Sequence, residues 1–306
     1  MKPLALALAF LLASACGGSS GGGAPTAPAP TAPTIPSGIS ALVASMFQQL
    51  PAYIQATLAD NQASLPRNPK NAASINAKIA LLQRPTLAGD ISAGRLFVES
   101  SVRSTDGRQI SMAAMFPEER YRTEATAALD VMQRTLPHLE RFMTTPFPAT
   151  TLRLWYGFTV GNSGGNAVLY MEDRTSYESR TSASRLPYDA ILAHEIAHTY
   201  LGNEAMTQFL ELYAYNRALG AGPDLGSWTF TRGYTGPSET NESSALVLDV
   251  YGLVGHDAMA RAYKAAVPLR PPYGQPIPAA VIEAFVNEAP SAVKEQVRAK
   301  LARVVA

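Results

Sequence analysis

The stretch His194-Glu195-Ile196-Ala197-His198 has two histidines four positions apart and a glutamate directly after the first. In a helix, residues i and i+4 lie on one face, one turn apart, so both imidazoles can point at one metal ion. Nitrogen donors suit Zn²⁺, and Glu195 would stand beside the open coordination position, where a carboxylate can take a proton from water. The chain has only four histidines, so this spacing is a specific signal for a metal-binding helix.

The flanking residues predict that this helix is buried. It is expected to begin after Pro187 and to end near Gly202-Asn203, a typical helix stop. A helix with so much apolar surface belongs inside a domain, where its polar side chains need partners that a zinc ion would supply. The apolar positions are Ile191, Leu192, Ile196, Tyr200 and Leu201.

The composition narrows the class of protein. The 306 residues include 25 Lys+Arg and 24 Asp+Glu, which gives a formal net charge of +1. This balance offers no electrostatic case for binding nucleic acid. The length allows one large domain or two small ones.

The N-terminus is typical of a targeting signal. Residues 1–15 comprise a short positive region and an apolar run that is too short to span a bilayer. The only cysteine, Cys16, follows Ala13-Ser14-Ala15, which resembles a bacterial lipoprotein signal with lipid attached to the cysteine. The alternative is an ordinary signal peptide with a chance cysteine. With a single cysteine, no disulfide is expected within the chain.

Residues 16–38 are rich in glycine, serine, alanine, proline and threonine, and they predict a flexible tether. The lipoprotein resemblance implies a membrane partner, through the lipid anchor, and a place in the bacterial cell envelope. Gly17 after the cysteine is similar to the signal for outer-membrane sorting, so the outer membrane or cell surface is expected, with the periplasmic side as an alternative.

The rest of the chain predicts an α+β fold. Residues 39–90 read as a helical N-terminal segment of two or three helices, broken around residues 65–69. Residues 91–306 are expected to form the main domain, in which a small mixed β-sheet is followed by a mainly helical half. The expected strands are 95–102, 109–116, 151–156 and 167–171, with a helix at 123–142 and helices after residue 187.

This order of elements and motifs resembles the gluzincin zinc metallopeptidases, which include thermolysin and the aminopeptidase N family. The run from His194 to Asn203 is similar to the aminopeptidase N pattern His-Glu-x-x-His-x-Trp-x-Gly-Asn, with Tyr200 in place of tryptophan. Residues 209–215 look like its Trp-Leu-x-Glu-Gly-Phe-Ala segment. The gap between the motifs is shorter and the large N-terminal β-domain is absent, so compact peptidase-MA-like domains are the closer comparison. The resemblance implies a zincin-like domain with one Zn²⁺.

Two glutamates compete for the role of third zinc ligand. If two antiparallel helices meet at Gly202-Asn203, His194 and His198 stand about 12 and 6 Å from that turn. Glu211 then stands at about 12 Å and Glu204 at about 2 Å. Glu211 is therefore expected to reach the metal more easily, and the resemblance agrees. Glu204 is the alternative, because it lies six positions after His198, which is the spacing of the third zinc ligand in metzincins.

The remaining site residues are less specific. Tyr234 lies in a glycine-rich turn that could deliver a phenol to the oxyanion of a tetrahedral intermediate, although a structural tyrosine is the alternative. Asn166 and Ala167 begin a stretch that is similar to the substrate-binding edge strand of thermolysin. The alternative for that stretch is a plain strand of the sheet. It lacks the acidic residue with which aminopeptidases bind a free α-amine.

Together these features predict a lipid-anchored zinc metallopeptidase that acts on a peptide or protein substrate. His194, His198 and Glu211 would hold the zinc, and Glu195 would be the general base toward a zinc-activated water. One alternative is a non-catalytic surface protein that uses a zincin fold for binding or assembly. Another is a zinc hydrolase of a non-peptide amide of the envelope.

Overall fold

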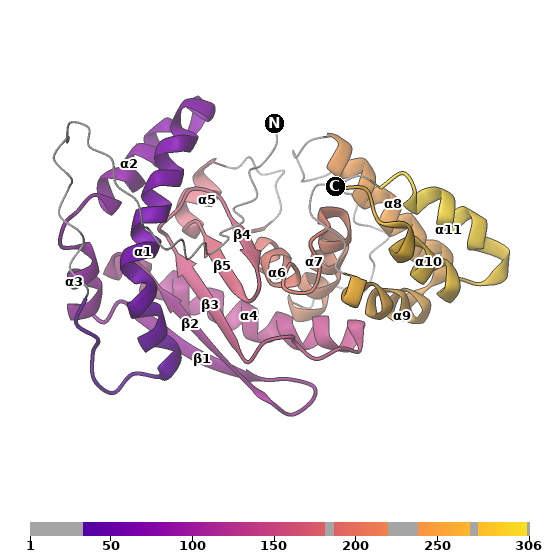
Figure 1. The fold of residues 1–306 in the computed structure, drawn as a ribbon, viewed down its shortest axis with the longest axis horizontal. Helices are drawn as coiled ribbons and strands as arrows, with labels where there is room; N and C mark the ends of the chain where they lie inside the picture. The colour runs from indigo at the N-terminus through magenta and orange to yellow at the C-terminus, as the bar shows by residue number, and fades with distance from the viewer. Residues whose placement is uncertain (1–32, 181–186, 220–237, 270–274, 305–306) are drawn as a thin grey trace, which may run out of the picture.

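The computed structural model describes residues 33–180, 187–219, 238–269 and 275–304. At its centre is a five-stranded mixed sheet in the order β1-β2-β3-β5-β4 (Figure 1). The β1–β2 and β4–β5 pairs are antiparallel, whereas β2–β3 and β3–β5 are parallel. The strands are β1 (Phe97–Arg103), β2 (Gln109–Met115), β3 (Thr151–Tyr156), β4 (Ser163–Gly165) and β5 (Val168–Met171).

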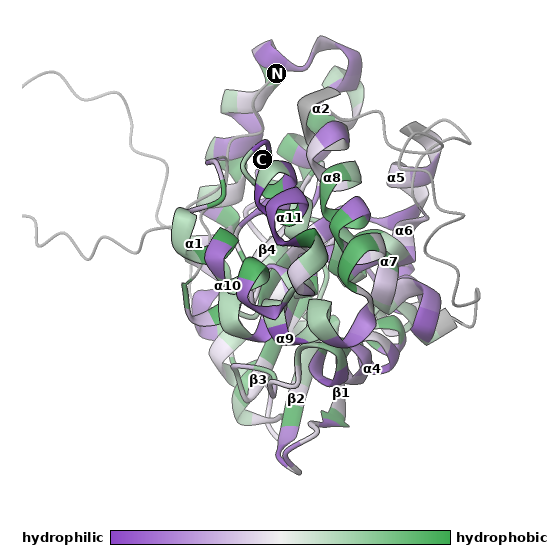
Figure 2. Cartoon of the chain, turned by 90° about the vertical axis from the view of Figure 1, so that its right-hand side faces the viewer, coloured by the Kyte–Doolittle hydropathy of each residue, from purple (hydrophilic) through white to green (hydrophobic). Residues whose placement is uncertain are grey.

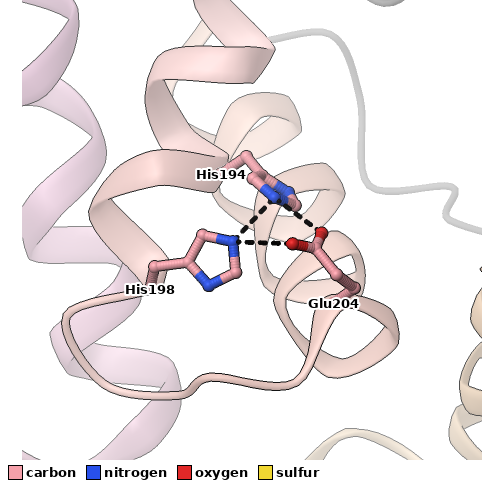
Figure 3. A group of neighbouring side chains, drawn as sticks. All are labelled: His194, His198 and Glu204. Carbon is pink, nitrogen blue, oxygen red and sulfur yellow. Dashed lines mark hydrogen bonds and ion pairs between the residues drawn. The ribbon is translucent and has the colours of Figure 1, made fainter. Parts of the chain in front are cut away.

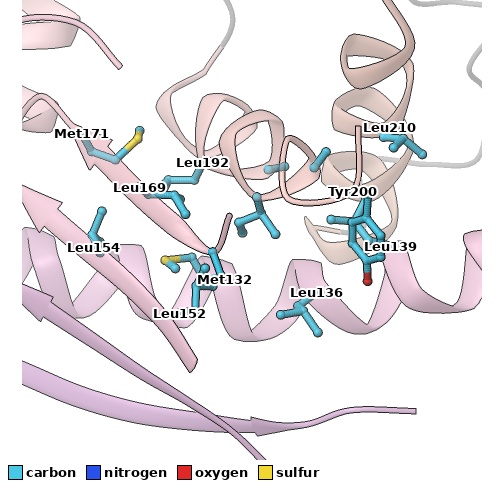
Figure 4. Packing of buried hydrophobic residues seen from close by; sticks show 14 of the residues in the cluster. Met132, Leu136, Leu139, Leu152, Leu154, Leu169, Met171, Leu192, Tyr200 and Leu210 are labelled. Atoms are coloured by element: carbon cyan, nitrogen blue, oxygen red, sulfur yellow. The ribbon is translucent and has the colours of Figure 1, made fainter. Parts of the chain in front are cut away.

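One face of the sheet packs against α4 (Arg122–Met143) and α6 (Tyr188–Ala197). Alternate residues of a strand point to the same face, so Leu152 and Leu154 lie beside Leu169 and Met171 in one apolar layer. Leu192 of α6 packs onto this layer (Figure 4). The helix predicted to carry the metal site is thus fixed to the sheet by fully buried side chains.

The opposite face of the sheet is covered by the N-terminal helix α1 (Ala41–Ser64). Tyr53 of α1 stacks on Trp155 of β3 with ring centroids 4.1 Å apart, and on Tyr170 of β5 at 5.6 Å. Seven residues of α1 between positions 42 and 54 belong to the same buried cluster as the sheet. The helical segment expected at 39–90 therefore contributes to the core that supports the site.

A buried ion pair also joins this segment to the sheet. Lys78 lies on α2 (Ala72–Leu82), and its Nζ is 2.8 Å from Oδ2 of Asp173, just beyond β5. The same ammonium donates to the carbonyl oxygen of Gly157 at 2.6 Å and to the hydroxyl of Tyr121 at 3.3 Å. The side chains of Lys78 and Asp173 are 7% and 4% exposed. The two opposite charges are therefore buried together, and each neutralises the other.

The chain after residue 187 is mainly helical where it is described, as predicted. Phe209 and Tyr213 of α7 pack with Phe142 of α4 and Tyr263 of α9. Hydrophobic residues lie on α7 and α8 where they meet, whereas α11 is largely hydrophilic (Figure 2). The helices are α7 (Glu204–Leu219), α8 (Ser238–Val254), α9 (His256–Ala266), α10 (Ala279–Glu288) and α11 (Lys294–Leu301).

The remaining helical segments are short connections, apart from α3 (Leu87–Ala93) and α5 (Arg174–Arg180). They are the 3₁₀ turns η1 (Leu65–Arg67), η2 (Pro69–Asn71), η3 (Glu119–Tyr121), η6 (Val267–Leu269) and η7 (Ser291–Val293). The predicted fold class, a small mixed sheet between an N-terminal helical segment and a helical half, is confirmed. Among the helices that the structure describes, none is both long enough and apolar enough to cross a bilayer.

The sequence prediction was wrong about which strand lies at the edge of the sheet. It placed the edge at residues 166–170, but β5 lies between β3 and β4, and β4 forms the edge. Asn166 and Ala167 are instead the two-residue turn between them, with φ angles of 49° and 60°. Positive φ at both turn positions is the type I′ geometry that joins tightly paired antiparallel strands.

Candidate metal centre

The site begins on α6, which is buried along nearly all its length. The helix starts after Pro187, and Asp189 in its first turn is ion-paired with Arg174 of α5. His194 and Glu195 are 7% and 5% exposed, and both lie in the last turn. The predicted helical spacing of the two histidines is therefore present, with His198 as the residue that ends the helix.

The two imidazoles converge on one point, together with a carboxylate from α7 (Figure 3). Nε2 of His194 lies 3.0 Å from Nε2 of His198. Oε2 of Glu204 is 3.1 Å from the first nitrogen, and its Oε1 is 3.3 Å from the second. These donors of three residues, all within 4.8 Å of one another, form a compact N, N, O group.

This geometry fits a zinc ion. Two donors bound to zinc at about 2.0–2.1 Å with a tetrahedral angle lie about 3.3 Å apart. The separations of 3.0, 3.1 and 3.3 Å in the structure are close to that value. Two imidazoles and one carboxylate are also the ligand set of many catalytic zinc sites, which keep the fourth position open.

The short connection between α6 and α7 brings Glu204 to the histidines. The sequence prediction extended the first helix to Gly202, but α6 ends at Ala197, and the chain turns back one helical turn earlier. Asn203 caps α7, since its Oδ1 accepts from the backbone N–H of Met206 at 3.1 Å. Glu204 is thus the first residue of α7 and lies level with the metal-binding nitrogens. An asparagine followed by an acid is itself a helix-start signal, and it could have revealed this boundary.

Glu211, the expected third ligand, lies on a different side of His194. Its Oε2 is 2.9 Å from Nδ1 of that histidine, not from the Nε2 atom that faces Glu204. The reason for this difference is that α6 ends one turn earlier than predicted. The histidines therefore lie closer to the connection between the two helices, at the level of Glu204 and not of Glu211. The geometry therefore favours Glu204, the alternative in the sequence prediction, as the third donor.

The carboxylates and imidazoles shift one another's pKa values strongly. Burial alone would lower the pKa of His194, but Glu204 and Glu211 raise it well above its ordinary value. Burial would raise the pKa of Glu204, yet the two histidines hold it far below the usual range. Burial raises the pKa of Glu211 despite its hydrogen bond to His194. Without metal, the group thus favours a protonated His194 beside an ionised Glu204, so a metal ion must displace a proton to bind.

Glu195 lies on the same helix turn as His194 but points toward the edge strand. A Cβ built on Gly164 of β4 would come within 2.9 Å of the Glu195 Cβ. Burial raises the pKa of the Glu195 carboxyl, and the charges of His194 and His198 oppose that shift. A carboxylate in this position can exchange protons nearer to neutral pH than an exposed glutamate can.

Of the other predicted site residues, Asn166 and Ala167 lie in the described part of the chain, in the turn between β4 and β5. The backbone N–H of Ala167 donates to Oγ1 of Thr199 at 3.2 Å, so the turn after β4 is bonded to the end of α6. That amide is therefore not free to bind a peptide, and Asn166 is exposed beside it. Tyr234, the predicted oxyanion donor, and Cys16, the predicted lipidation site, lie outside the described residues.

Comparisons with known proteins find only distant likeness. No family model and no curated protein sequence matches it. Among solved structures, it is similar to Legionella pneumophila aminopeptidase A in complex with aspartic acid, at 14% identity, TM-score 0.49, over 68% of this chain and 28% of that one. It is also similar to an M1 zinc metallopeptidase from Deinococcus radiodurans, at 14% identity, TM-score 0.45, over 69% of this chain and 53% of that one.

The chain thus spans about a quarter and about half of the lengths of these two structures. Likeness at this level supports no conclusion about function. A proposal about function has to rest on the residues of the site.

Proposed function

We propose that the chain is a zinc metallopeptidase in which His194, His198 and Glu204 hold one Zn²⁺. The observation that carries this proposal is that the two Nε2 atoms lie 3.0 Å apart and each lies 3.1–3.3 Å from one oxygen of the Glu204 carboxylate, close to the spacing of donors around a tetrahedral zinc ion. Bound there, zinc would activate a water molecule and polarise the scissile carbonyl group.

Glu195 is the proposed general base. It directly follows one ligand on a buried helix, so its carboxylate is held beside the open side of the site. The same group would then deliver the proton to the leaving nitrogen, because a raised pKa keeps the acid form accessible. Tyr234 stays the proposed donor to the oxyanion.

The edge strand β4 is the proposed substrate platform. Among the described strands β4 is the last in the sheet, and such an edge can add an extended peptide as a further strand, a common mode of peptide recognition. Gly164 in the middle of β4 lies against Glu195, so a peptide bound along this edge would pass the proposed base. This arrangement favours a peptide bond over a non-peptide amide as the substrate, because main-chain pairing needs an extended peptide.

The lipid anchor and the cell-envelope location are separate proposals, based on the apolar run before Cys16. A Cys16→Ser variant is expected to lose radiolabelled palmitate and to leave the membrane fraction. A wild-type protein recovered unanchored with a free thiol would contradict both proposals, without bearing on the metal site.

Metal analysis and two substitutions test the catalytic proposal. Wild-type protein should bind about one zinc per chain, and His198→Ala should lose it. Glu195→Gln should keep zinc and fold but lose most peptide hydrolysis, because base and proton donor are removed together.

Absence of zinc in wild-type protein after zinc-replete preparation would refute the proposed site. Hydrolysis that is equal in wild type and Glu195→Gln would show that the activity comes from a contaminant. Zinc binding without turnover of any peptide in a broad library would favour a binding or assembly protein instead.

A further inference from the structure

The two ring nitrogens of His194 face different carboxylates. Nε2 lies 3.1 Å from Glu204, and Nδ1 lies 2.9 Å from Glu211. A neutral imidazole carries one N–H, and the nitrogen that binds a metal must be the other one. If Nε2 is the metal-binding atom, Nδ1 carries the hydrogen and donates it to Oε2 of Glu211.

Packing alone does not explain why a carboxylate occupies position 211. The Glu211 side chain is 1% exposed, and its Oε1 has no hydrogen-bond partner among the described residues. Burial of a carboxylate is costly unless it is paired. Among the described residues, this carboxylate is hydrogen-bonded to His194. Its position is therefore explained by an interaction with the ring.

The ring of His198 is also oriented through its Nδ1 atom, but by a backbone carbonyl group, which is a weaker acceptor than a carboxylate. Nδ1 of His198 lies 3.1 Å from the carbonyl oxygen of Leu201, with Oγ1 of Thr207 at 3.5 Å. Both rings are thus oriented from Nδ1, with Nε2 left facing the common centre. The charged partner of His194 makes that ring the better donor to a metal, because a carboxylate raises the basicity of the imidazole to which it is bonded.

We infer that Glu211 is a positioning residue, which fixes the ring orientation and tautomer of His194 from outside the ligand set. The inference rests on the proposed zinc site, and it assigns to Glu211 a role other than the ligand role that the sequence resemblance implies. Loss of such an outer partner usually weakens metal binding about 10- to 100-fold while the ligands stay the same.

The test compares zinc affinity and Co²⁺ visible absorption in the full chain. Zinc dissociation constants are measured by competition with a chelator for wild type, Glu211→Gln, Glu211→Ala and Glu204→Ala. Co²⁺ substituted for zinc reports the coordination geometry through its absorption bands. Glu140→Gln is the matched control, because Glu140 is also fully buried but accepts from Ser104, Thr105 and Phe147 instead.

Glu211→Gln retains an acceptor oxygen without charge, so we expect about 10-fold weaker zinc binding, and Glu211→Ala about 100-fold. Both should keep the wild-type Co²⁺ spectrum, whereas Glu204→Ala should change it and bind zinc still more weakly. Glu140→Gln should lower stability to urea but leave zinc affinity unchanged.

Unchanged zinc affinity in both Glu211 variants would overturn the inference while leaving the proposed function intact. A changed Co²⁺ spectrum in Glu211→Ala, with a wild-type spectrum in Glu204→Ala, would also overturn it by making Glu211 the ligand. Failure of wild-type protein to bind zinc would instead refute the proposed function itself.

Discussion

Gly164 of β4 lies so close to Glu195 of α6 that a Cβ at position 164 would approach the Glu195 carbonyl oxygen to 2.5 Å. Real Cβ atoms essentially never come this near another heavy atom, so only glycine fits. The edge strand and the metal-binding helix are therefore in backbone contact. The distance between a substrate bound on β4 and the proposed base is set by this contact.

Gly164→Ala should disturb this spacing. The added methyl group must push β4 away from α6, and such overpacking costs about 1–3 kcal/mol of unfolding free energy. We expect kcat/KM for a peptide to fall more than zinc affinity, since the crowded contact is with Glu195 and not with a proposed ligand. Gly89→Ala is the control, because a Cβ there meets nothing within 4 Å. Equal kcat/KM for Gly164→Ala and wild type would argue against β4 as the substrate platform.

Peptides with blocked N-termini should be cleaved at least as fast as those with a free α-amine. β4 consists of Ser163, Gly164 and Gly165, which offer no carboxylate to an ammonium group. The acid nearest in sequence after the hairpin, Glu172, is buried and accepts a hydrogen bond from the Gly161 N–H. An ammonium group left unpaired at the edge is costly to desolvate. The measurement compares one peptide series in free and acetylated forms, and strict dependence on the free amine would reject this prediction.

Lys78→Met should destabilise the whole chain. The substitution leaves the Asp173 carboxylate buried without its cation, which typically costs about 3–5 kcal/mol. Urea unfolding gives the change in free energy. Lys300→Met is the matched control, because the Lys300–Asp249 pair is exposed and worth at most about 1 kcal/mol. Similar losses in the two variants would show that the buried pair contributes no more than a surface one.

The same pair predicts a dependence of stability on pH. Burial alone would raise the pKa of Asp173, but Lys78 and the hydrogen bonds from Ser176 lower it below its ordinary value. Since the folded-state pKa is the lower one, the contribution is fully present above the unfolded pKa of about 3.9 and is lost as pH falls through the folded value. Asp173→Asn should remove this part of the acid destabilisation. Unfolding free energies from pH 7 to pH 3 check it, and parallel curves for the two proteins would contradict it.

Local spacing was enough to predict the centre of the site. His194, Glu195 and His198 follow from helical periodicity, which depends only on neighbouring residues. The choice between Glu204 and Glu211 depends instead on where α6 ends and how residues 198–203 turn the chain back to α7. That path is set by the cap at Asn203 and by packing on the sheet, neither of which periodicity reports.

The edge of the sheet was mispredicted for a similar reason. Ser163-Gly164-Gly165 has none of the β-branched or aromatic residues that mark a strand, and it becomes one only through pairing with β5. Lys78 likewise reads as a solvent-exposed helix residue, because its partner Asp173 is 95 positions away in the sequence. Contacts of this range are decided by the tertiary fold.

The stacking of Tyr53 on Trp155 has a consequence for the order of folding. The N-terminal helix is made first, but the aromatic face it covers is synthesised about 100 residues later, so the contact is strongly non-local. Phe47 of α1 can pack on Phe97 of β1 earlier, but until β3 and β5 exist the ring of Tyr53 lacks the aromatic partners it stacks on in the folded protein. The aromatic part of α1 therefore remains without its final partner while about 100 further residues are synthesised.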